Sequence, residues 1–365
     1  MKIAITADLH LKQQDTTPDR YNALSDIIKK LATQNINNLI IAGDLFDKES
    51  QNYSDFEKFC SSQQINSKNI NFYIIPGNHD FSISQNYFTL ENIQIITNPI
   101  IINFGENNKS ISFLFIPYKT SKSIGEILSE QGDKLKNFKD NFLIIGHGDY
   151  ITGLRNPNTY EPGIYMPLTR KDLDFYNPLK VFLGHIHKKA KLGKVYYPGS
   201  PCGLDINETG KRSFLIFDTD SLEVEEQTIE TDYIYINESL IVIPALNEEE
   251  YIKEKIAQII KKYEISDKDI SKVKIRLQVK GYTLDKSNLL KLIKENIFKM
   301  GLKFYNDEQP DLTDVFILND PDRISIAKKV KEEIEKLQLD NENQLDNEYF
   351  SKDKILEKAL KLIFC

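Results

Sequence analysis

All five histidines of this 365-residue chain lie in short motifs, each directly after an apolar run that predicts a β-strand. They are His10, His79, His147, His185 and His187. The same motifs hold two aspartates and an asparagine, namely Asp8, Asp44 and Asn78. Carboxylate, imidazole and amide groups in such numbers can bind two divalent metal ions side by side. These residue types therefore predict metal-assisted hydrolysis of a phosphoester.

The spacing of the motifs predicts that their side chains converge. In chain order they read D-L-H (8–10), G-D-L-F-D (43–47), G-N-H-D (77–80), G-H-G (146–148) and G-H-I-H (184–187). Residues two apart in an extended segment point to the same side. Ligands gather where the strands of such sheets end, and the glycines before the ligands let the backbone approach closely. We therefore expect one crevice lined by all five motifs.

The types of ligand also favour particular metals. Asp44 is the natural bridge, because a carboxylate can span two ions about 3.5–4 Å apart. No cysteine stands in the five motifs. Mixed oxygen and nitrogen ligands suit Mn²⁺, Fe or Zn²⁺ in an open catalytic site better than a closed structural zinc site. We predict two divalent ions and favour Mn²⁺.

The segments around the motifs predict an α/β fold. Apolar runs flanked by polar or turn-forming residues predict buried strands at 2–8, 38–44, 71–77, 141–147 and 180–185. Between the first two, a helical face is formed by Leu24, Ile27, Ile28 and Leu31. Further strands are expected at 93–98, 111–117, 194–198 and 213–218. Together these elements predict a four-layer sandwich, with helices outside two packed β-sheets.

The composition changes near residue 230, where a small α+β domain is predicted. Helices are expected at 248–263 and 286–300, the second capped by Asp285. Between them, the strand 272–280 alternates apolar side chains with basic or polar ones, so that one face is buried and the other is wet and basic.

After Pro321 the chain predicts two short amphipathic helices, at about 323–338 and 351–363. The last helix carries an apolar face formed by Ile355, Ala359, Leu362 and Ile363. Little chain remains to cover this face, so it indicates either a partner surface or packing against the second domain. The predicted domains are 1–230, 231–320 and 321–365.

Charge and composition disfavour some classes of protein. The chain has 47 Lys and Arg against 54 Asp and Glu, a net charge of −7, which argues against holding polyanions by bulk charge. The opening MKIAITADLH predicts a strand rather than a signal peptide, and no apolar run approaches the roughly 20 residues of a membrane span. Three scattered cysteines, Cys60, Cys202 and Cys365, favour a reduced setting. We expect a cytoplasmic protein without a membrane segment.

The five motifs, taken in order, resemble the signature of the calcineurin-like metallophosphoesterase superfamily. Within it the chain looks most like the nuclease subunit of SbcCD-type DNA-repair complexes. Three features carry this narrower likeness: G-D-L-F-D in the second motif, Y-P-G-S-P at 197–201, and E-T-G-K-R-S-F-L-I-F at 208–217. The likeness is strong over residues 1–220, weaker through 230–320 and mostly positional beyond.

The resemblance implies roles for individual residues. One metal would take Asp8, His10, Asp44 and His187; the other would take Asp44, Asn78, His147 and His185. Water activated by the ions would attack phosphorus in line. His79 would act on the leaving oxygen, and Asp80 could orient or tune its imidazole.

The resemblance also implies partners. These are DNA, contacted in part by the small capping domain at 231–320, an SbcC-type coiled-coil ATPase docked through the C-terminal helices, and a second copy in a homodimer. The chain departs from the eukaryotic and archaeal members at Asp47, where those proteins often carry a histidine. Asp47 therefore indicates the bacterial branch, and it either orients a ligand or caps a helix, as does Asp80.

Basic and aromatic residues near the motifs are candidate DNA contacts. A cluster after the last motif comprises Lys188, Lys189, Lys191, Lys194, Lys211 and Arg212. Such a cluster can neutralise DNA phosphates, or it is an ordinary solvated face. Arg155, Tyr160 and Tyr165, between the fourth and fifth motifs, can contact a strand end by stacking or ion pairing, or they simply fill a loop.

The function expected from these observations is a metal-dependent DNA exonuclease and endonuclease of DNA repair or recombination. One alternative is a small-nucleotide phosphodiesterase or a protein phosphatase of the same superfamily; the additional region from residue 230 onward speaks against it. Another is a scaffold that keeps the fold without catalysing, and the complete set of ligands speaks against that.

Overall fold

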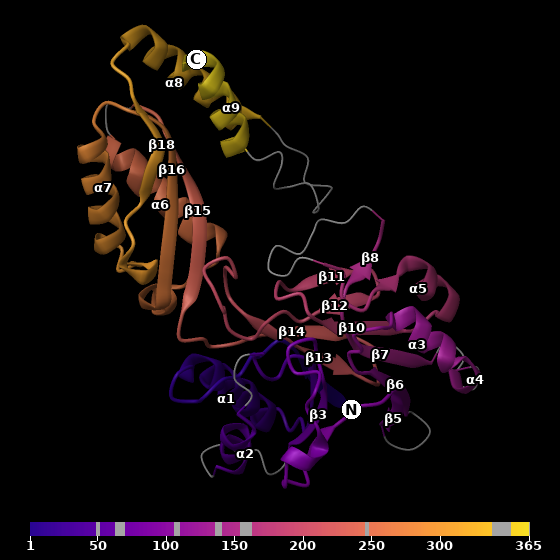
Figure 1. The fold of residues 1–365 in the computed structure, drawn as a ribbon. Helices are drawn as coiled ribbons and strands as arrows, with labels where there is room; N and C mark the ends of the chain where they lie inside the picture. Colours follow the sequence, from indigo (N-terminus) through magenta and orange to yellow (C-terminus); the bar gives the residue numbers. More distant parts are fainter. Residues whose placement is uncertain are drawn as a thin grey trace. The chain divides into compact units, whose positions relative to one another are not determined.

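The computed structural model describes residues 1–48, 52–62, 70–105, 110–135, 141–153, 163–244, 248–337 and 352–364. The chain divides into two compact units (Figure 1). Unit 1 comprises Met1–Leu204 and Lys211–Asp232, and unit 2 comprises Asp205–Gly210 and Tyr233–Cys365. Each unit has hydrophobic cores of its own.

The first sheet of unit 1 precedes three of the five motifs. Its strand order is β14-β13-β1-β2-β3-β4. The strands are β1 (Lys2–Thr6), β2 (Asn38–Ala42), β3 (Asn71–Ile75), β4 (Ile93–Ile95), β13 (Ser213–Asp218) and β14 (Val224–Thr228). Strands β1 to β4 are parallel, whereas β13 is antiparallel to both of its neighbours. The carboxyl ends of β1, β2 and β3 therefore meet at one edge.

The second sheet of unit 1 carries the other two motifs. Its strand order is β11-β12-β10-β7-β6-β5. The strands are β5 (Ile100–Phe104), β6 (Ile111–Ile116), β7 (Phe142–His147), β10 (Lys180–Gly184), β11 (Ala190–Leu192) and β12 (Val195–Tyr197). Strands β6, β7, β10 and β12 are parallel, and the antiparallel β5 and β11 form the edges.

Apolar side chains from both sheets form one buried layer between them. Ile5 and Phe217 of the first sheet pack in the same cluster as Phe113 and Ile145 of the second. Neighbouring residues in β1 point the other way, since Ala4 packs in the outer cluster. Both faces of the central strands are thus buried, which explains their nearly continuous apolar runs in the sequence.

Helices cover the outer faces of the two sheets (Figure 1). On the first sheet lie α1 (Pro18–Thr33) and α2 (Tyr53–Ser61); on the second lie α3 (Ile124–Glu130) and α5 (Arg170–Tyr176). The shorter elements are η2 (Gln85–Tyr87), α4 (Gly132–Leu135), β8 (Tyr150–Ile151) and β9 (Leu168–Thr169). In α1 the predicted face is buried at Leu24, Ile27, Ile28 and Leu31. The α/β two-sheet sandwich is therefore confirmed.

Unit 2 is a small α+β assembly. Its parallel strands are β15 (Ile234–Val242), β16 (Val273–Thr283), β17 (Lys303–Phe304) and β18 (Asp311–Ile317). The helices α6 (Glu248–Lys262) and α7 (Lys286–Lys299) share its core, with 3₁₀ turns η5 (Asp267–Lys272) and η6 (Tyr305–Asp307). Strand β16 alternates buried and half-buried residues as predicted, and Asp285 caps α7 by accepting hydrogen bonds from the Ser287 and Asn288 amides.

The last two helices, α8 (Pro321–Lys336) and α9 (Lys352–Phe364), pack together and against β15 and β16 within unit 2. The buried face of α9 is formed by Leu356 and Leu360, with Ile355 and Ala359 partly buried beside them. Leu362 is 85% exposed, so it does not belong to the covered face. Two of the four residues of the predicted apolar face, Ile355 and Ala359, therefore pack within unit 2, and the prediction is corrected at Leu362.

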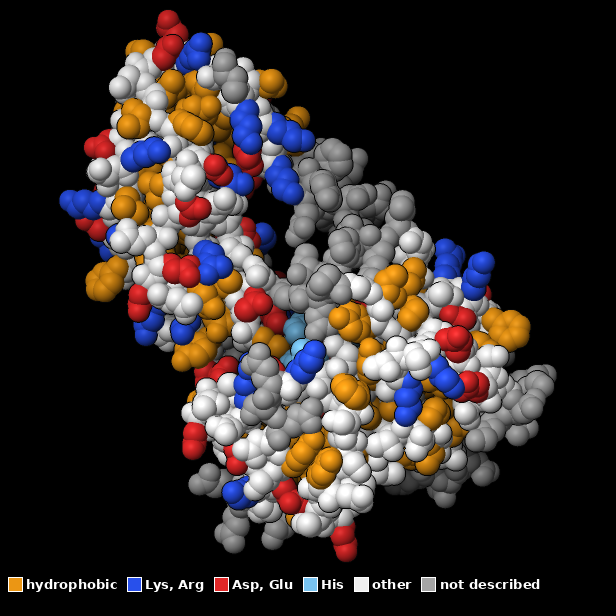
Figure 2. All heavy atoms as spheres, viewed as in Figure 1, with side chains coloured by type: hydrophobic (Ala, Val, Ile, Leu, Met, Phe, Trp, Pro, Cys, Tyr) orange, Lys and Arg blue, Asp and Glu red, His pale blue; other side chains and the backbone are white. Residues whose placement is uncertain are grey.

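The surface of the molecule carries both signs of charge. Figure 2 shows Lys and Arg side chains interspersed with Asp and Glu side chains over the visible face. This agrees with the modest net charge of −7. Among the helices that the structure describes, none combines the length and the low charge needed to cross a membrane.

Candidate metal centre

The predicted ligands come together in unit 1 at the carboxyl ends of strands from both sheets. Asp8 follows β1, Asp44 follows β2 and Asn78 follows β3, while His147 ends β7 and His185 follows β10. The side chains of Asp8, His10, Asp44, His147 and His185 are all buried. Histidine atoms are nevertheless visible in Figure 2, so part of the histidine cluster is exposed at the surface.

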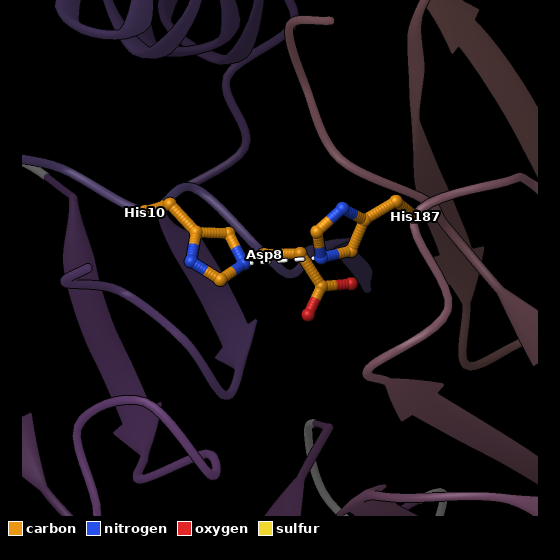
Figure 3. A group of neighbouring side chains, drawn as sticks. All are labelled: Asp8, His10 and His187. Atoms are coloured by element: carbon orange, nitrogen blue, oxygen red, sulfur yellow. Dashed lines mark hydrogen bonds between the residues drawn. The ribbon is translucent and has the colours of Figure 1, made fainter. Parts of the chain in front are cut away.

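Asp8, His10 and His187 form the first possible metal site (Figure 3). One ligand atom from each lies within 4.8 Å of the other two. The Nε2 atoms of His10 and His187 are 3.1 Å apart. Metal–nitrogen bonds of about 2.0–2.1 Å place two adjacent ligand nitrogens about 3 Å apart. These two imidazoles, supplied by loops far apart in sequence, therefore fit one ion.

Asp44 lies at the centre of the remaining ligands. Its Oδ2 is 3.7 Å from His10 Nε2 and 3.3 Å from His147 Nε2. Asn78 Oδ1 lies 2.7 Å from the same His147 nitrogen and 3.2 Å from His185 Nδ1. Asp44 is thus shared between the two groups of ligands, which is the position a bridging carboxylate needs.

A buried oxygen of Asp8 indicates that a cation belongs here. Asp8 Oδ1 accepts a hydrogen bond of 2.8 Å from the His185 amide. Its other oxygen, Oδ2, is buried and has no hydrogen-bond partner among the residues that the structure describes. Leaving a buried carboxylate oxygen unpaired is costly, and a metal ion would satisfy it. The donor set therefore fits the two divalent ions predicted.

The backbone is strained at several of these ligands. Asp8, His10 and Asp44 have φ angles of 56°, 49° and 51°, and His185 has 92°. Few non-glycine residues adopt positive φ, and each costs about 1–3 kcal/mol unless the surroundings enforce it. Strained positions of this kind cluster at functional sites because they aim side chains that a regular strand would direct elsewhere.

Glycines make room for the ligands. A Cβ atom on Gly43 would lie 2.0 Å from His147 Nδ1, and one on Gly77 would lie 2.1 Å from Asp44 Oδ1. Gly184 is equally confined, since its Cβ would lie 2.1 Å from the Ala42 carbonyl oxygen. That same carbonyl oxygen is 2.9 Å from His147 Nδ1, a contact that fixes the ring and leaves Nε2 for a metal.

Burial and charge set the protonation of the ligands. Burial lowers the pKa of His10 to about 3, which keeps this imidazole neutral and able to ligate. Burial also disfavours a charged His147, but the Asp44 and Asp8 carboxylates outweigh it and raise the pKa of His147 to about 9. Burial raises the pKa of Asp8 to about 6. The buried carboxylates thus favour a positive charge in this cluster, which a proton on His147 or a metal ion would supply.

His79 and Asp80 lie beside the ligands. The His79 ring is half-buried, with its centroid 4.6 Å from that of His10 in a T-shaped arrangement. The His79 amide donates to Asp44 Oδ1 at 2.8 Å. The buried Asp80 accepts hydrogen bonds from the Gly77 amide at 2.7 Å and the Phe46 amide at 3.1 Å. Asp80 therefore joins the second and third motif loops, and its proposed action on the His79 imidazole stays a prediction.

The candidate DNA contacts have different outcomes. Lys188 and Lys189 are exposed, and Lys189 forms an ion pair with Glu226. Arg212 is only 7% exposed and donates hydrogen bonds to main-chain and side-chain oxygens, so the expectation that it meets DNA phosphates is wrong. Arg155 and Tyr160 lie outside the described residues. The Tyr165 ring lies 4.7 Å from that of His185, which places it at the site.

Sequence reasoning missed two residues beside the ligands. Arg20, in the first turn of α1, donates to the His10 carbonyl oxygen and lies 3.5 Å from Asp47 Oδ2. Asp47 therefore neighbours an arginine, and the next described helix, α2, is capped by Asn52. The buried Asp149 lies 3.9 Å from His185 Nε2. The only sequence signal for Asp149 was its position directly after the G-H-G motif. No sequence signal indicated Arg20.

Replacing Gly43 by alanine tests how closely the backbone approaches His147. The added Cβ would meet the imidazole, so we expect metal affinity to fall about 10–100-fold. Calorimetric titration with Mn²⁺ measures this. The matched control is Gly193→Ala, since Gly193 also has positive φ (63°) but open space around its Cβ. Equal affinities for the two variants would contradict the account.

Metal binding should release a proton from His147. With its pKa raised to about 9, this imidazole is protonated at pH 7.5 and must become neutral to bind a metal. We expect release of about one proton and an affinity that rises with pH until about 9. Titration calorimetry in buffers with different ionisation enthalpies measures it; a heat that is independent of the buffer would refute the prediction.

Comparisons with known proteins agree with this geometry. The calcineurin-like phosphoesterase family model matches residues 1–189. The DNA double-strand break repair protein Mre11 of Nanoarchaeum equitans (strain Kin4-M) is 26% identical over 248 residues, 59% of this chain. The chain spans 66% of the length of that relative.

Two solved structures are also similar to the chain. An archaeal phosphodiesterase has 18% identity and a TM-score of 0.32, covering 62% of this chain and 99% of its own. A dimetal phosphatase from Danio rerio has 11% identity and a TM-score of 0.38, and the match covers 63% of this chain and 96% of the phosphatase chain. Because the family model matches more than half of the chain, and its motifs supply the clustered ligands, the chain belongs to the calcineurin-like phosphoesterase family.

Proposed function

We propose that this protein is a metal-dependent DNA nuclease that hydrolyses phosphodiester bonds in DNA repair or recombination. The observation that carries the proposal is the gathering of the seven predicted ligands, Asp44 among them, at one site in a chain similar to Mre11. The likeness to a repair protein favours DNA over the substrates of other phosphoesterases.

Two divalent ions would be held by seven side chains. One ion would be held by Asp8, His10 and His187. The other would be held by Asn78, His147 and His185. Asp44 would bind both ions. When bound, the ions lower the pKa of water and neutralise the charge that develops on the phosphate. We favour Mn²⁺ because nitrogen and oxygen ligands predominate and no thiolate takes part.

The chain itself supplies orientation and a proton. His79 is half-buried beside His10, and its main-chain amide donates a hydrogen bond to Asp44 Oδ1 that fixes the loop carrying it. We infer that its imidazole protonates the leaving oxygen or stabilises the charge there. Asp80 holds this loop against the second motif through the Gly77 and Phe46 amides. Lys188 and Lys189, exposed beyond the last motif, would attract the DNA backbone.

The proposed function also implies binding partners and a cellular location. By likeness to SbcCD-type nucleases we infer a homodimer, a coiled-coil SbcC-type ATPase and a cytoplasmic location. Residues 231–320 would contact DNA and 321–365 would meet the ATPase. On α9 the side chain of Leu362 is exposed and available for that contact, while Leu356 and Leu360 are buried within unit 2.

Initial rates on different phosphoesters test the substrate. With Mn²⁺ present, we expect cleavage of short single-stranded DNA to exceed hydrolysis of a cyclic nucleotide and of p-nitrophenyl phosphate.

Replacing His79 by asparagine should lower the rate of DNA cleavage by about 10²–10⁴-fold while both ions remain bound. Tyr87→Phe, on the exposed turn after the same loop, is the control.

The contrary results separate the alternatives. A preference for the small phosphoesters would indicate a nucleotide phosphodiesterase or a phosphatase. Two bound ions without hydrolysis of any phosphoester would indicate a scaffold. Unchanged DNA cleavage by His79→Asn would remove His79 from the mechanism.

A further inference from the structure

Two arginines reach the main chain of the same pair of metal ligands. Arg212 donates through Nη2 to the carbonyl oxygen of His187, and Arg20 donates through Nη1 to that of His10. His10 and His187 are the two histidines whose Nε2 atoms lie 3.1 Å apart. The main-chain carbonyl oxygen of each of these two histidines thus accepts a hydrogen bond from an arginine guanidinium.

Arg212 is enclosed by its acceptors. Its Nε donates to the Ser200 carbonyl oxygen at 2.9 Å, and its Nη2 donates to Ser200 Oγ at 2.6 Å. The Ser200 amide donates to the His187 carbonyl oxygen at 3.1 Å, so that oxygen receives two hydrogen bonds. Gly199 has φ of 76°, and a Cβ there would lie 2.7 Å from the same oxygen. The segment that follows β12 therefore packs directly on the His187 backbone.

Arg20 is placed in a comparable way beside His10. Its side chain is 12% exposed and lies in the first turn of α1, between the His10 carbonyl oxygen and Asp47. His10 has φ of 49°, a conformation that needs support from its surroundings. Asp47 balances the charge of the guanidinium, 3.5 Å from Nη1.

The geometry of arginine explains why these positions are arginine. A guanidinium is planar, stays charged and presents five N–H donors in a fixed fork, so it can bind several acceptors at once. A lysine ammonium has a flexible stem and cannot reproduce that fork. Groups that orient metal ligands typically contribute about 10–100-fold to metal affinity.

We propose that Arg20 and Arg212 are positioning residues that hold the His10–His187 pair, and with it one of the two metal ions. This inference rests on the proposed function. The effect should be confined to one ion, because the other ligands are fixed by different contacts: His147 by its ring against the Ala42 carbonyl oxygen, and Asn78 against His147 and His185.

The test measures Mn²⁺ binding to the Arg212→Lys and Arg20→Lys variants, by titration calorimetry and by electron paramagnetic resonance. With two equivalents of Mn²⁺ the wild-type protein should give the signal of a spin-coupled pair. In each variant we expect one equivalent to bind about 10–100-fold more weakly, so that the signal of isolated Mn²⁺ replaces the coupled one. The control Arg170→Lys changes an exposed arginine of α5 in the same unit.

A milder variant guards against loss of folding. Ser200→Ala removes one acceptor of Arg212 but keeps the guanidinium, so it should weaken the same equivalent by a smaller factor. Circular dichroism with EDTA present shows whether each variant folds without metal.

The outcomes separate this inference from the proposed function. Wild-type protein without a coupled pair would overturn both. A coupled pair in the wild type that persists with unchanged affinities in Arg212→Lys, Arg20→Lys and Ser200→Ala would overturn only the role of the arginines. Selective loss of one ion in folded variants supports it, because general destabilisation would not pick out one site.

Discussion

The attraction between two buried carboxylates and positive charge is the interaction on which the site depends. Asp8 and Asp44 are almost completely buried, and one oxygen of Asp8 has no hydrogen-bond partner among the described residues. The same two carboxylates raise the pKa of the neighbouring His147, so the cluster favours positive charge. Divalent ions would satisfy the carboxylates and the imidazoles together, which explains why so many polar side chains are buried at one place in an apolar fold.

The fold meets this requirement by bringing strand ends together. Parallel β1, β2 and β3 of the first sheet, and β7 and β10 of the second, end at the same place. The side chains turn inward because the backbone departs from regular geometry immediately after the strands, with positive φ at Asp8 and Asp44. The apolar layer between the sheets makes these ends rigid, and a rigid frame is what preorganised catalysis needs.

The sequence predicted the sheets and the ligands because both leave signals in residue types. Apolar runs marked the strands, and imidazoles and carboxylates at short spacing marked the site. Arg212 was misassigned as a DNA contact because its main partners are carbonyl oxygens, which every residue has and no pattern reveals. The strained backbone at His185 was equally invisible, since φ there is imposed by tertiary packing.

Anomalous scattering from crystals grown with saturating Mn²⁺ tests the central claim most directly. The account predicts two peaks on either side of the Asp44 carboxylate, about 3.5–4 Å apart, one beside His10 and His187 and the other beside His147 and His185. A single peak, or none, would contradict it.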